Sequence, residues 1–263
     1  MIIDSHCHVW PDTIAPQVLS GKIAGLDPMG SGTISGLLEK MDDAGIDYAC
    51  CLGVATVAKN LEKTNEFIGS VDRSRLIPFG TIRPDRTLEE NMTSLVDNEI
   101  VGVKLHPNFQ GIDLADPRVI EICQALADEG IVVITHAGEG SDSAATERGS
   151  PEKVLALSEA VPHLTLMACH YGAYHQLDLG EKVLVGSRVI LETSWPPTMT
   201  LLDPDRIRSI IERHGADKVV YGSDWPMADP VAEIAGVRAL GLSQSDETAV
   251  LGGNLARILG MSS

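Results

Sequence analysis

Residues 116–136 read Asp-Pro-Arg-Val-Ile-Glu-Ile-Cys-Gln-Ala-Leu-Ala-Asp-Glu-Gly-Ile-Val-Val-Ile-Thr-His. The pair Asp116-Pro117 is typical of a helix start, because the aspartate caps the first turn and proline has no N–H to lose there. Gly130 falls where a helix end needs a left-handed residue. The run 131–134 is apolar throughout, as parallel strands buried on both faces are. This stretch therefore predicts a helix followed by a strand in an α/β protein.

The same pattern extends in both directions along the chain. Proline follows a capping residue at Ser150, Asp203 and Asp229, and glycine follows predicted helices at positions 45 and 215. Strands are expected at 2–8, 48–54, 77–81, 101–106, 131–136, 164–169, 188–193 and 219–223. Helices are expected at 33–45, 57–72, 87–98, 116–129, 151–160, 175–186, 204–214, 230–240 and 245–259.

Eight strands that alternate with helices predict a (β/α)8 TIM barrel. The length of 263 residues suits this fold, which typically needs about 250. No linker rich in proline, glycine or serine divides the sequence, so we expect a single domain over residues 1–263. A doubly wound open sheet is the competing fold, but no glycine-rich phosphate-binding turn follows the first strand.

The composition limits the partners of the protein. The net charge is −17, from 20 basic and 37 acidic residues, which argues against binding to nucleic acid or to anionic membranes. The chain has no apolar run of membrane-spanning length and begins without a recognisable targeting segment. Five cysteines, an odd number, favour reduced thiols and a cytoplasmic location. We expect a small-molecule substrate, and assembly into a homo-oligomer stays open.

The strongest chemical signal is Asp4-Ser5-His6-Cys7-His8, at the end of the first expected strand. Side chains alternate across a strand, so His6 and His8 share one face. In a barrel that face is the interior, where two imidazoles can bind one ion. An isolated pair of this kind is weak support for a metal site, because histidines are more often surface or core residues.

Further polar residues close other apolar strands. His136 ends the fifth strand, His170 the sixth and Asp224 the eighth. The active sites of barrels lie at the carboxyl ends of the strands, so these side chains and the first-strand histidines should converge. Imidazole and carboxylate ligands suit Zn²⁺, Mn²⁺, Fe²⁺ or Ni²⁺. Asp224 is placed to take a proton from a bound water and return it to a leaving group.

This constellation resembles the amidohydrolase superfamily, and most closely its amidohydrolase-related (amidohydrolase 2) branch. The matching segments are residues 3–9, 103–107, 134–138, 221–226 and 253–260, together with His170. The resemblance implies one divalent metal ion, with Zn²⁺ favoured, held by His6, His8, His136 and Asp224. It implies that His170 is either a catalytic group or a ligand of a second ion.

Lys104 and His106 share one face of the fourth expected strand. In dihydroorotase-like members of the superfamily a lysine on this strand is carboxylated and bridges two metals, which would require a second ion here. The alternative is an unmodified cation that orients the substrate, and this role is favoured. His106 is expected to line the pocket. Arg83, just after the third strand, is a candidate to bind a substrate anion, and the alternative is an ordinary surface arginine.

The resemblance does not fix the reaction. We expect a hydrolase that acts on an amide, a lactone or a related carbonyl compound through a metal-activated water, with Asp224 and His170 as catalytic residues. A non-oxidative decarboxylase of a small carboxylic acid is the alternative. A metal protein without catalysis is disfavoured, because a buried ionisable cluster is costly to retain without chemistry.

Overall fold

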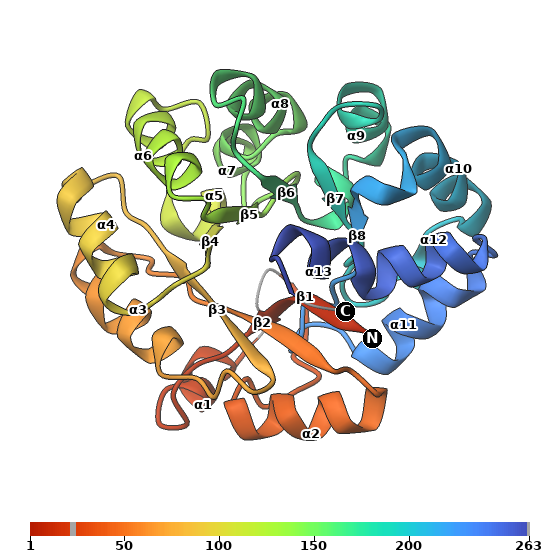
Figure 1. The fold of residues 1–263 in the computed structure, drawn as a ribbon, viewed down its shortest axis with the longest axis horizontal. Coiled ribbons are helices and arrows are strands. Elements are labelled where there is room, and N and C mark those ends of the chain that lie inside the picture. The colour runs from red at the N-terminus through yellow and green to blue at the C-terminus, as the bar shows by residue number, and fades with distance from the viewer. Residues whose placement is uncertain (22–24, 262–263) are drawn as a thin grey trace. The chain divides into compact units, whose positions relative to one another are not determined.

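The computed structural model describes residues 1–21 and 25–261. Eight strands form one sheet whose order, β1 to β8, follows the sequence (Figure 1). The strands are β1 Ile3–His8, β2 Tyr48–Leu52, β3 Leu76–Thr81, β4 Gly102–Leu105, β5 Val132–Thr135, β6 Leu166–Ala168, β7 Ile190–Glu192 and β8 Val219–Val220. The pairs from β3 to β7 are parallel. The predicted (β/α)8 class is confirmed.

Helices occupy all the segments in which they were predicted. They are α1 Ala15–Val18, α2 Ile34–Ala44, α3 Leu61–Gly69, α4 Leu88–Asp97, α5 Pro107–Gln110, α6 Pro117–Asp128, α7 Ser143–Arg148, α8 Pro151–Ala160, α9 Leu177–Leu184, α10 Pro204–His214, α11 Pro230–Ala239, α12 Gln244–Thr248 and α13 Asn254–Ile258. The short helices α1, α5 and α7 lie in segments where no helix was predicted.

The last predicted helix, 245–259, is not continuous. Residues Ala249–Gly253 form a π-helix between α12 and α13. A Cβ atom on Gly252 would lie 2.6 Å from the carbonyl oxygen of Met1. The carbonyl of Val250 accepts a hydrogen bond of 2.9 Å from the N–H of Tyr221. The wider π turn therefore brings the helix backbone close to the start of the chain and to the segment after β8.

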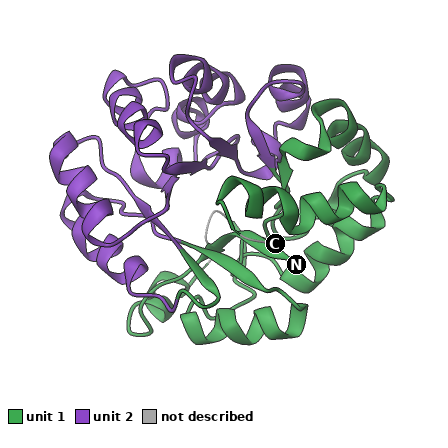
Figure 2. Cartoon of the chain, viewed as in Figure 1, with its two compact units in different colours: residues 1–51, 73–77, 192–263 green, residues 52–72, 78–191 purple. Residues whose placement is uncertain are grey.

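The chain divides into two compact units, which interleave in the sequence (Figure 2). Unit 1 contains residues 1–51, 73–77 and 192–263, and unit 2 contains residues 52–72 and 78–191. The single-domain interpretation stays a prediction.

In unit 2, amphipathic helices cover the apolar strands. Helix α6 begins at the predicted cap, where the Asp116 side chain accepts from the N–H of Arg118. Its buried residues, Val119, Ile122, Cys123 and Leu126, follow the helical spacing of one face. The helix packs against β5 and α4. This packing holds β5 so that its carboxyl end presents His136.

In unit 1, the backbone joins β1 to the segment that follows β8. The N–H of Ser5 donates to the carbonyl of Tyr221 at 3.0 Å, and the N–H of Asp224 donates to the carbonyl of His6 at 2.9 Å. The N–H of His8 donates to the carbonyl of Trp225 at 2.7 Å. This ladder fixes the register between the histidine motif and Asp224.

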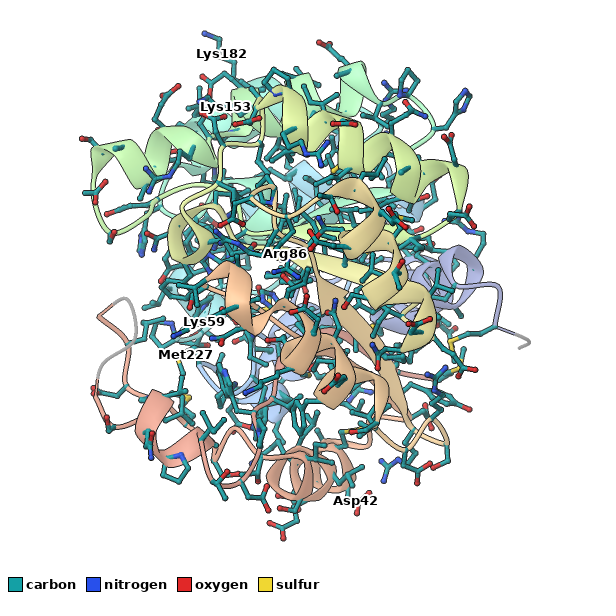
Figure 3. The ribbon with its side chains drawn as sticks, turned by 90° about the vertical axis from the view of Figure 1, so that its left-hand side faces the viewer. Asp42, Lys59, Arg86, Lys153, Lys182 and Met227 are labelled. Atoms are coloured by element: carbon teal, nitrogen blue, oxygen red, sulfur yellow. The ribbon has the colours of Figure 1, made fainter. Side chains whose placement is uncertain are left out.

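Asp42 of α2 and Lys182 of α9 are examples of charged side chains that are exposed (Figure 3). All five cysteines are buried, and none of them forms a disulfide. Within the described ranges, every helix is too short or too polar to cross a membrane.

A buried glutamate anchors the loop after β7. Glu233 of α11 is 1% exposed, and its Oε1 accepts a hydrogen bond of 2.9 Å from the N–H of Met199. Burial raises the pKa of Glu233 to about 7, since a carboxylate loses hydration inside the protein.

The raised pKa of Glu233 makes stability depend on pH. Between its unfolded pKa of 4.5 and about 7, the native protein keeps a proton that the unfolded chain releases. The free energy of unfolding should therefore fall by roughly 3 kcal/mol as pH rises through this window. Glu233→Gln should lack this decline. Urea unfolding of both proteins at pH 4.5, 6 and 8 measures the difference, and parallel curves would show that Glu233 does not titrate as described.

Candidate functional site

Three side chains that the sequence predicted as metal ligands converge in unit 1. His6 and His8 extend from one face of β1, and Asp224 comes from the segment after β8. The Nε2 atom of His6 lies 3.2 Å from His8 Nε2 and 3.2 Å from Asp224 Oδ1. His8 Nε2 lies 3.7 Å from the same oxygen. The three atoms form a compact triangle, and the three residues form a group able to hold a metal ion.

The separations within the triangle match those between ligand atoms around a single metal ion. Ligand atoms about 2.1 Å from one Zn²⁺ ion are about 3.4 Å apart in a tetrahedron and about 3.0 Å apart at right angles in an octahedron. The three observed separations, 3.2, 3.2 and 3.7 Å, are close to these values. The residues therefore fit a divalent cation without movement of the strands.

Asp224 adopts a strained backbone conformation. Its φ angle is +65°, in the left-handed region that residues with a Cβ atom seldom occupy. Its carbonyl accepts a hydrogen bond of 2.7 Å from the N–H of Met227. Such strain costs on the order of 1 kcal/mol or more and is concentrated at functional sites. Here it directs the Asp224 carboxylate toward the two histidines.

A buried aspartate connects the two strand ends beneath this group. Asp4 Oδ1 accepts hydrogen bonds from the N–H of His6, at 3.0 Å, and from the N–H of Ser223, at 2.9 Å. Burial raises the pKa of Asp4 to about 6. Asp4 thus bonds to the backbone of His6 in β1 and to the backbone of Ser223, the residue before Asp224. These two bonds stabilise the position of β1 relative to the segment that carries Asp224. The sequence motif contained Asp4, but the prediction gave it no role.

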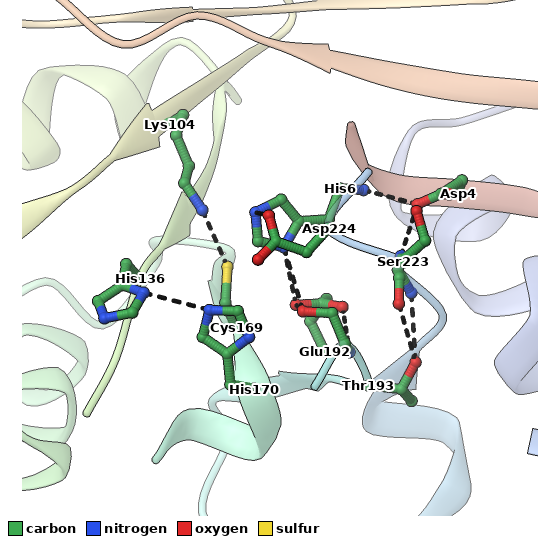
Figure 4. A network of polar contacts seen from close by, with 12 residues as sticks. Asp4, His6, Lys104, His136, Cys169, His170, Glu192, Thr193, Ser223 and Asp224 are labelled. Atoms are coloured by element: carbon green, nitrogen blue, oxygen red, sulfur yellow. Dashed lines mark hydrogen bonds and ion pairs between the residues drawn. The ribbon is translucent and has the colours of Figure 1, made fainter. Parts of the chain in front are cut away.

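Glu192 is a further member of the group that the sequence prediction missed. It ends β7, is fully buried, and places Oε2 3.2 Å from His6 Nδ1 (Figure 4). Its signal in the sequence is a single carboxylate after the apolar residues 189–191. The same feature identified Asp224, but Glu192 lies inside the expected strand and not at its end.

Unit 2 brings together two other predicted residues. His136 Nδ1 lies 3.1 Å from His170 Nε2, and His136 Nε2 lies 3.1 Å from the carbonyl oxygen of Glu139. A carbonyl only accepts, so Nε2 carries the proton and the lone pair of a neutral His136 is on Nδ1. Two imidazole nitrogens at this separation either share a hydrogen or face one ion. Like Asp224, His170 has a positive φ angle, +61°.

The electrostatics around His136 keep its ring neutral. Burial, followed by the charge of Lys104, lowers the pKa of His136 to about 4. Lys104 is itself fully buried, and its Nζ donates to Cys169 Sγ at 3.1 Å (Figure 4). The neutral ring has a lone pair available for a ligand at physiological pH.

Two of the predicted substrate-binding residues have structural partners in unit 2. His106 stacks on His136, with ring centroids 4.5 Å apart. All three guanidinium nitrogens of Arg83 donate hydrogen bonds, to the Asp85 carboxylate and to carbonyl oxygens that include those of Thr56 and Gln110. Arg83 thus joins loops of unit 2, and these bonds compete with any bond to a substrate.

Of the four predicted metal ligands, unit 1 brings together His6, His8 and Asp224. His136 belongs to unit 2, so its membership of this ligand set stays a prediction. The roles predicted for His170, Lys104, His106 and Arg83 also stay predictions.

A family model described as amidohydrolase (Amidohydro_2) matches residues 3–261, nearly the whole chain. This protein belongs to the amidohydrolase-2 family. The resemblance seen in the motifs is thereby confirmed. A comparison with curated proteins gives no match.

Solved structures support the fold of this amidohydrolase-2 protein. An uncharacterized TIM-barrel protein from Bordetella bronchiseptica is 19% identical, covers 98% of each chain and gives a TM-score of 0.76. The 5-carboxyvanillate decarboxylase of Sphingomonas paucimobilis is 14% identical, with 99% of each chain covered and a TM-score of 0.72. A probable 2-pyrone-4,6-dicarboxylic acid hydrolase from Acinetobacter baumannii is 16% identical, with 99% coverage of each and a TM-score of 0.68. The similar structures thus include both a decarboxylase and a hydrolase.

Proposed function

We propose that this amidohydrolase-2 protein is a metal-dependent hydrolase that acts on a small-molecule amide, lactone or related carbonyl compound. The observation that carries the proposal is the convergence of His6 Nε2, His8 Nε2 and Asp224 Oδ1 within 3.2–3.7 Å. A carboxylate oxygen and imidazole lone pairs repel one another unless a cation or a proton lies among them. The chemistry of this donor set therefore favours a bound divalent cation, for which we propose Zn²⁺.

The cation would be held by His6, His8 and Asp224, with His136 as the fourth ligand predicted from the sequence. When bound, it lowers the pKa of a coordinated water toward about 7 and polarises a carbonyl oxygen of the substrate. The Asp224 carboxylate has a second oxygen, Oδ2, which can accept the proton of the attacking water and later deliver it to the leaving group. His170 is proposed to stabilise the developing oxyanion.

Lys104 is proposed to be an unmodified cation that orients the substrate, with His106 beside it. Its Nζ donates to Cys169 Sγ at 3.1 Å. A carboxylated Lys104 would instead call for a second metal ion. The five cysteines form no disulfide with one another, and we propose a cytoplasmic location.

The alternative is a metal-dependent decarboxylase of a small carboxylic acid. Similar structures include 5-carboxyvanillate decarboxylase and 2,6-dihydroxybenzoate decarboxylase, and this observation favours the alternative. In that reaction Asp224 or His170 would manage the proton at the carbon that loses CO₂.

Product analysis distinguishes the two reactions. The metal-loaded protein is incubated with a panel of lactones, amides and aromatic or α,β-unsaturated carboxylic acids, and both CO₂ and ring-opened or cleaved products are measured. Hydrolysis products without CO₂ support the proposal, and CO₂ release supports the decarboxylase. A protein that binds metal but turns over none of these compounds would contradict both.

A further inference from the structure

Glu192 is a fully buried carboxylate on which three hydrogen-bond donors converge. Its Oε1 accepts from the N–H of Ser194 at 2.6 Å, and its Oε2 accepts from the Ser194 hydroxyl at 2.8 Å. The third donor is His6, whose Nδ1 lies 3.2 Å from Oε2. Burial of a carboxylate is costly unless such bonds replace its hydration. Ser194 therefore fixes the orientation in which Glu192 meets His6.

The backbone of unit 1 leaves space for this carboxylate. A Cβ atom on Gly222, just after β8, would lie 2.3 Å from Glu192 Oε1 and 2.8 Å from Ser5 Oγ. Any larger residue at position 222 would displace the carboxylate. The pairing of Glu192 with His6 thus depends on a glycine in the neighbouring strand segment, and this is a second observation besides the hydrogen bonds.

The contact favours one tautomer of His6. The Glu192 carboxylate only accepts, and the Ser194 hydroxyl, 3.3 Å from His6 Nδ1, already donates to Glu192 Oε2. Both neighbours are therefore satisfied when the hydrogen of His6 is on Nδ1. The lone pair of the neutral ring is then on Nε2, which faces His8 Nε2 and Asp224 Oδ1 at 3.2 Å each. In the other tautomer, Nε2 would present a hydrogen to the ligand triangle and could not bind a cation.

We propose that Glu192 is a positioning residue that holds His6 in the Nδ1–H tautomer and directs its Nε2 lone pair at the cation. This inference rests on the proposed metal site. The negative charge of Glu192 also makes the imidazole a more basic ligand, as carboxylates bound to metal-ligating histidines generally do. The Ser194 hydroxyl lies 3.3 Å from His6 Nδ1 and donates to Glu192 Oε2 at 2.8 Å, so Ser194 contacts His6 both directly and through Glu192.

The test compares Glu192→Gln with Glu233→Gln, a matched change of another buried glutamate in unit 1. Zn²⁺ affinity is measured by competition with a chelator on the full-length protein. Glu192→Gln should raise the Kd for Zn²⁺ about 10–100-fold. The glutamine amide can donate a hydrogen bond to Nδ1 of His6, and this stabilises the Nε2–H tautomer, which cannot bind the cation. Glu233→Gln should bind Zn²⁺ like the wild type. Equal affinity in Glu192→Gln and the wild type would overturn the inference.

A second measurement does not need bound metal. Long-range ¹H–¹⁵N NMR spectra of the metal-free protein at pH 8 report the tautomer of each histidine, and the His6 signals are those lost in His6→Gln. We expect His6 of the wild type as the Nδ1–H tautomer and a shift toward Nε2–H in Glu192→Gln. A wild-type His6 in the Nε2–H form would overturn the inference, even if Glu192→Gln failed to fold.

The two measurements separate this inference from the proposed function. If the wild type binds no divalent metal but His6 is the Nδ1–H tautomer, the metal site is wrong and the orienting contact stands. If the wild type binds Zn²⁺ and Glu192→Gln changes neither affinity nor tautomer, the metal site stands and the role of Glu192 is wrong.

Discussion

Replacement of Asp224 by asparagine is expected to lower kcat by at least about 10²-fold, because general acid–base groups typically contribute about 10²–10⁴-fold. Asparagine keeps the shape and one carbonyl oxygen of the side chain but cannot accept a proton. Because His6 and His8 remain, Asp224→Asn should retain much of its metal. The measurement is kcat and metal stoichiometry on the same purified protein, with a substrate from the product analysis.

The control for Asp224→Asn is Asp229→Asn. Asp229 follows in the same segment and caps α11 through a hydrogen bond to the N–H of Val231, a role that asparagine fills equally well. Its kcat should equal that of the wild type. Near wild-type turnover in Asp224→Asn would refute the proton-transfer role. Loss of metal and activity together would leave Asp224 as a ligand only, with His170 as the candidate for proton transfer.

Removal of a histidine from the ligand triangle is expected to abolish metal binding and activity together. In His6→Ala, two of the three converging side chains in unit 1 remain, those of His8 and Asp224. In His8→Ala the contact between His6 and Glu192 stays intact, so loss of metal there cannot be attributed to damage at Glu192. Elemental analysis of the purified proteins measures the occupancy, and far-ultraviolet circular dichroism measures whether each variant folds.

His163→Ala is the matched control for the two histidine variants, because His163 is exposed. It should keep its metal and its activity. Full metal occupancy in folded His6→Ala would show that His6 is not a ligand, and the same result in both variants would exclude the triangle as the metal site.

The sequence could predict the elements that depend on periodicity. Alternation along a strand put His6 and His8 on one face, and the structure places their Nε2 atoms 3.2 Å apart. Asp224 was recognisable because a carboxylate closes an apolar run at the end of a strand. The helix boundaries at Asp116 and Gly130 were predictable because capping chemistry is local.

Features that depend on long-range packing were not predictable in this way. The contact of Glu192 with His6 joins residues 186 positions apart, and only the register of the strands creates it. The role of Asp4 likewise arises from its bond to Ser223, 219 positions away. The π-helix at Ala249–Gly253 has ordinary helical periodicity in the sequence, and its backbone neighbours, Met1 and Tyr221, are far away along the chain.

A crystal structure of the protein with Zn²⁺, phased on the anomalous signal of the metal, tests the central claim most directly. The account predicts an ion within about 2.0–2.2 Å of His6 Nε2, His8 Nε2 and an Asp224 oxygen, with His6 Nδ1 still bonded to Glu192. Fully occupied crystals in which the ion lies away from these three atoms, or protein that takes up no ion at saturating Zn²⁺, would contradict it.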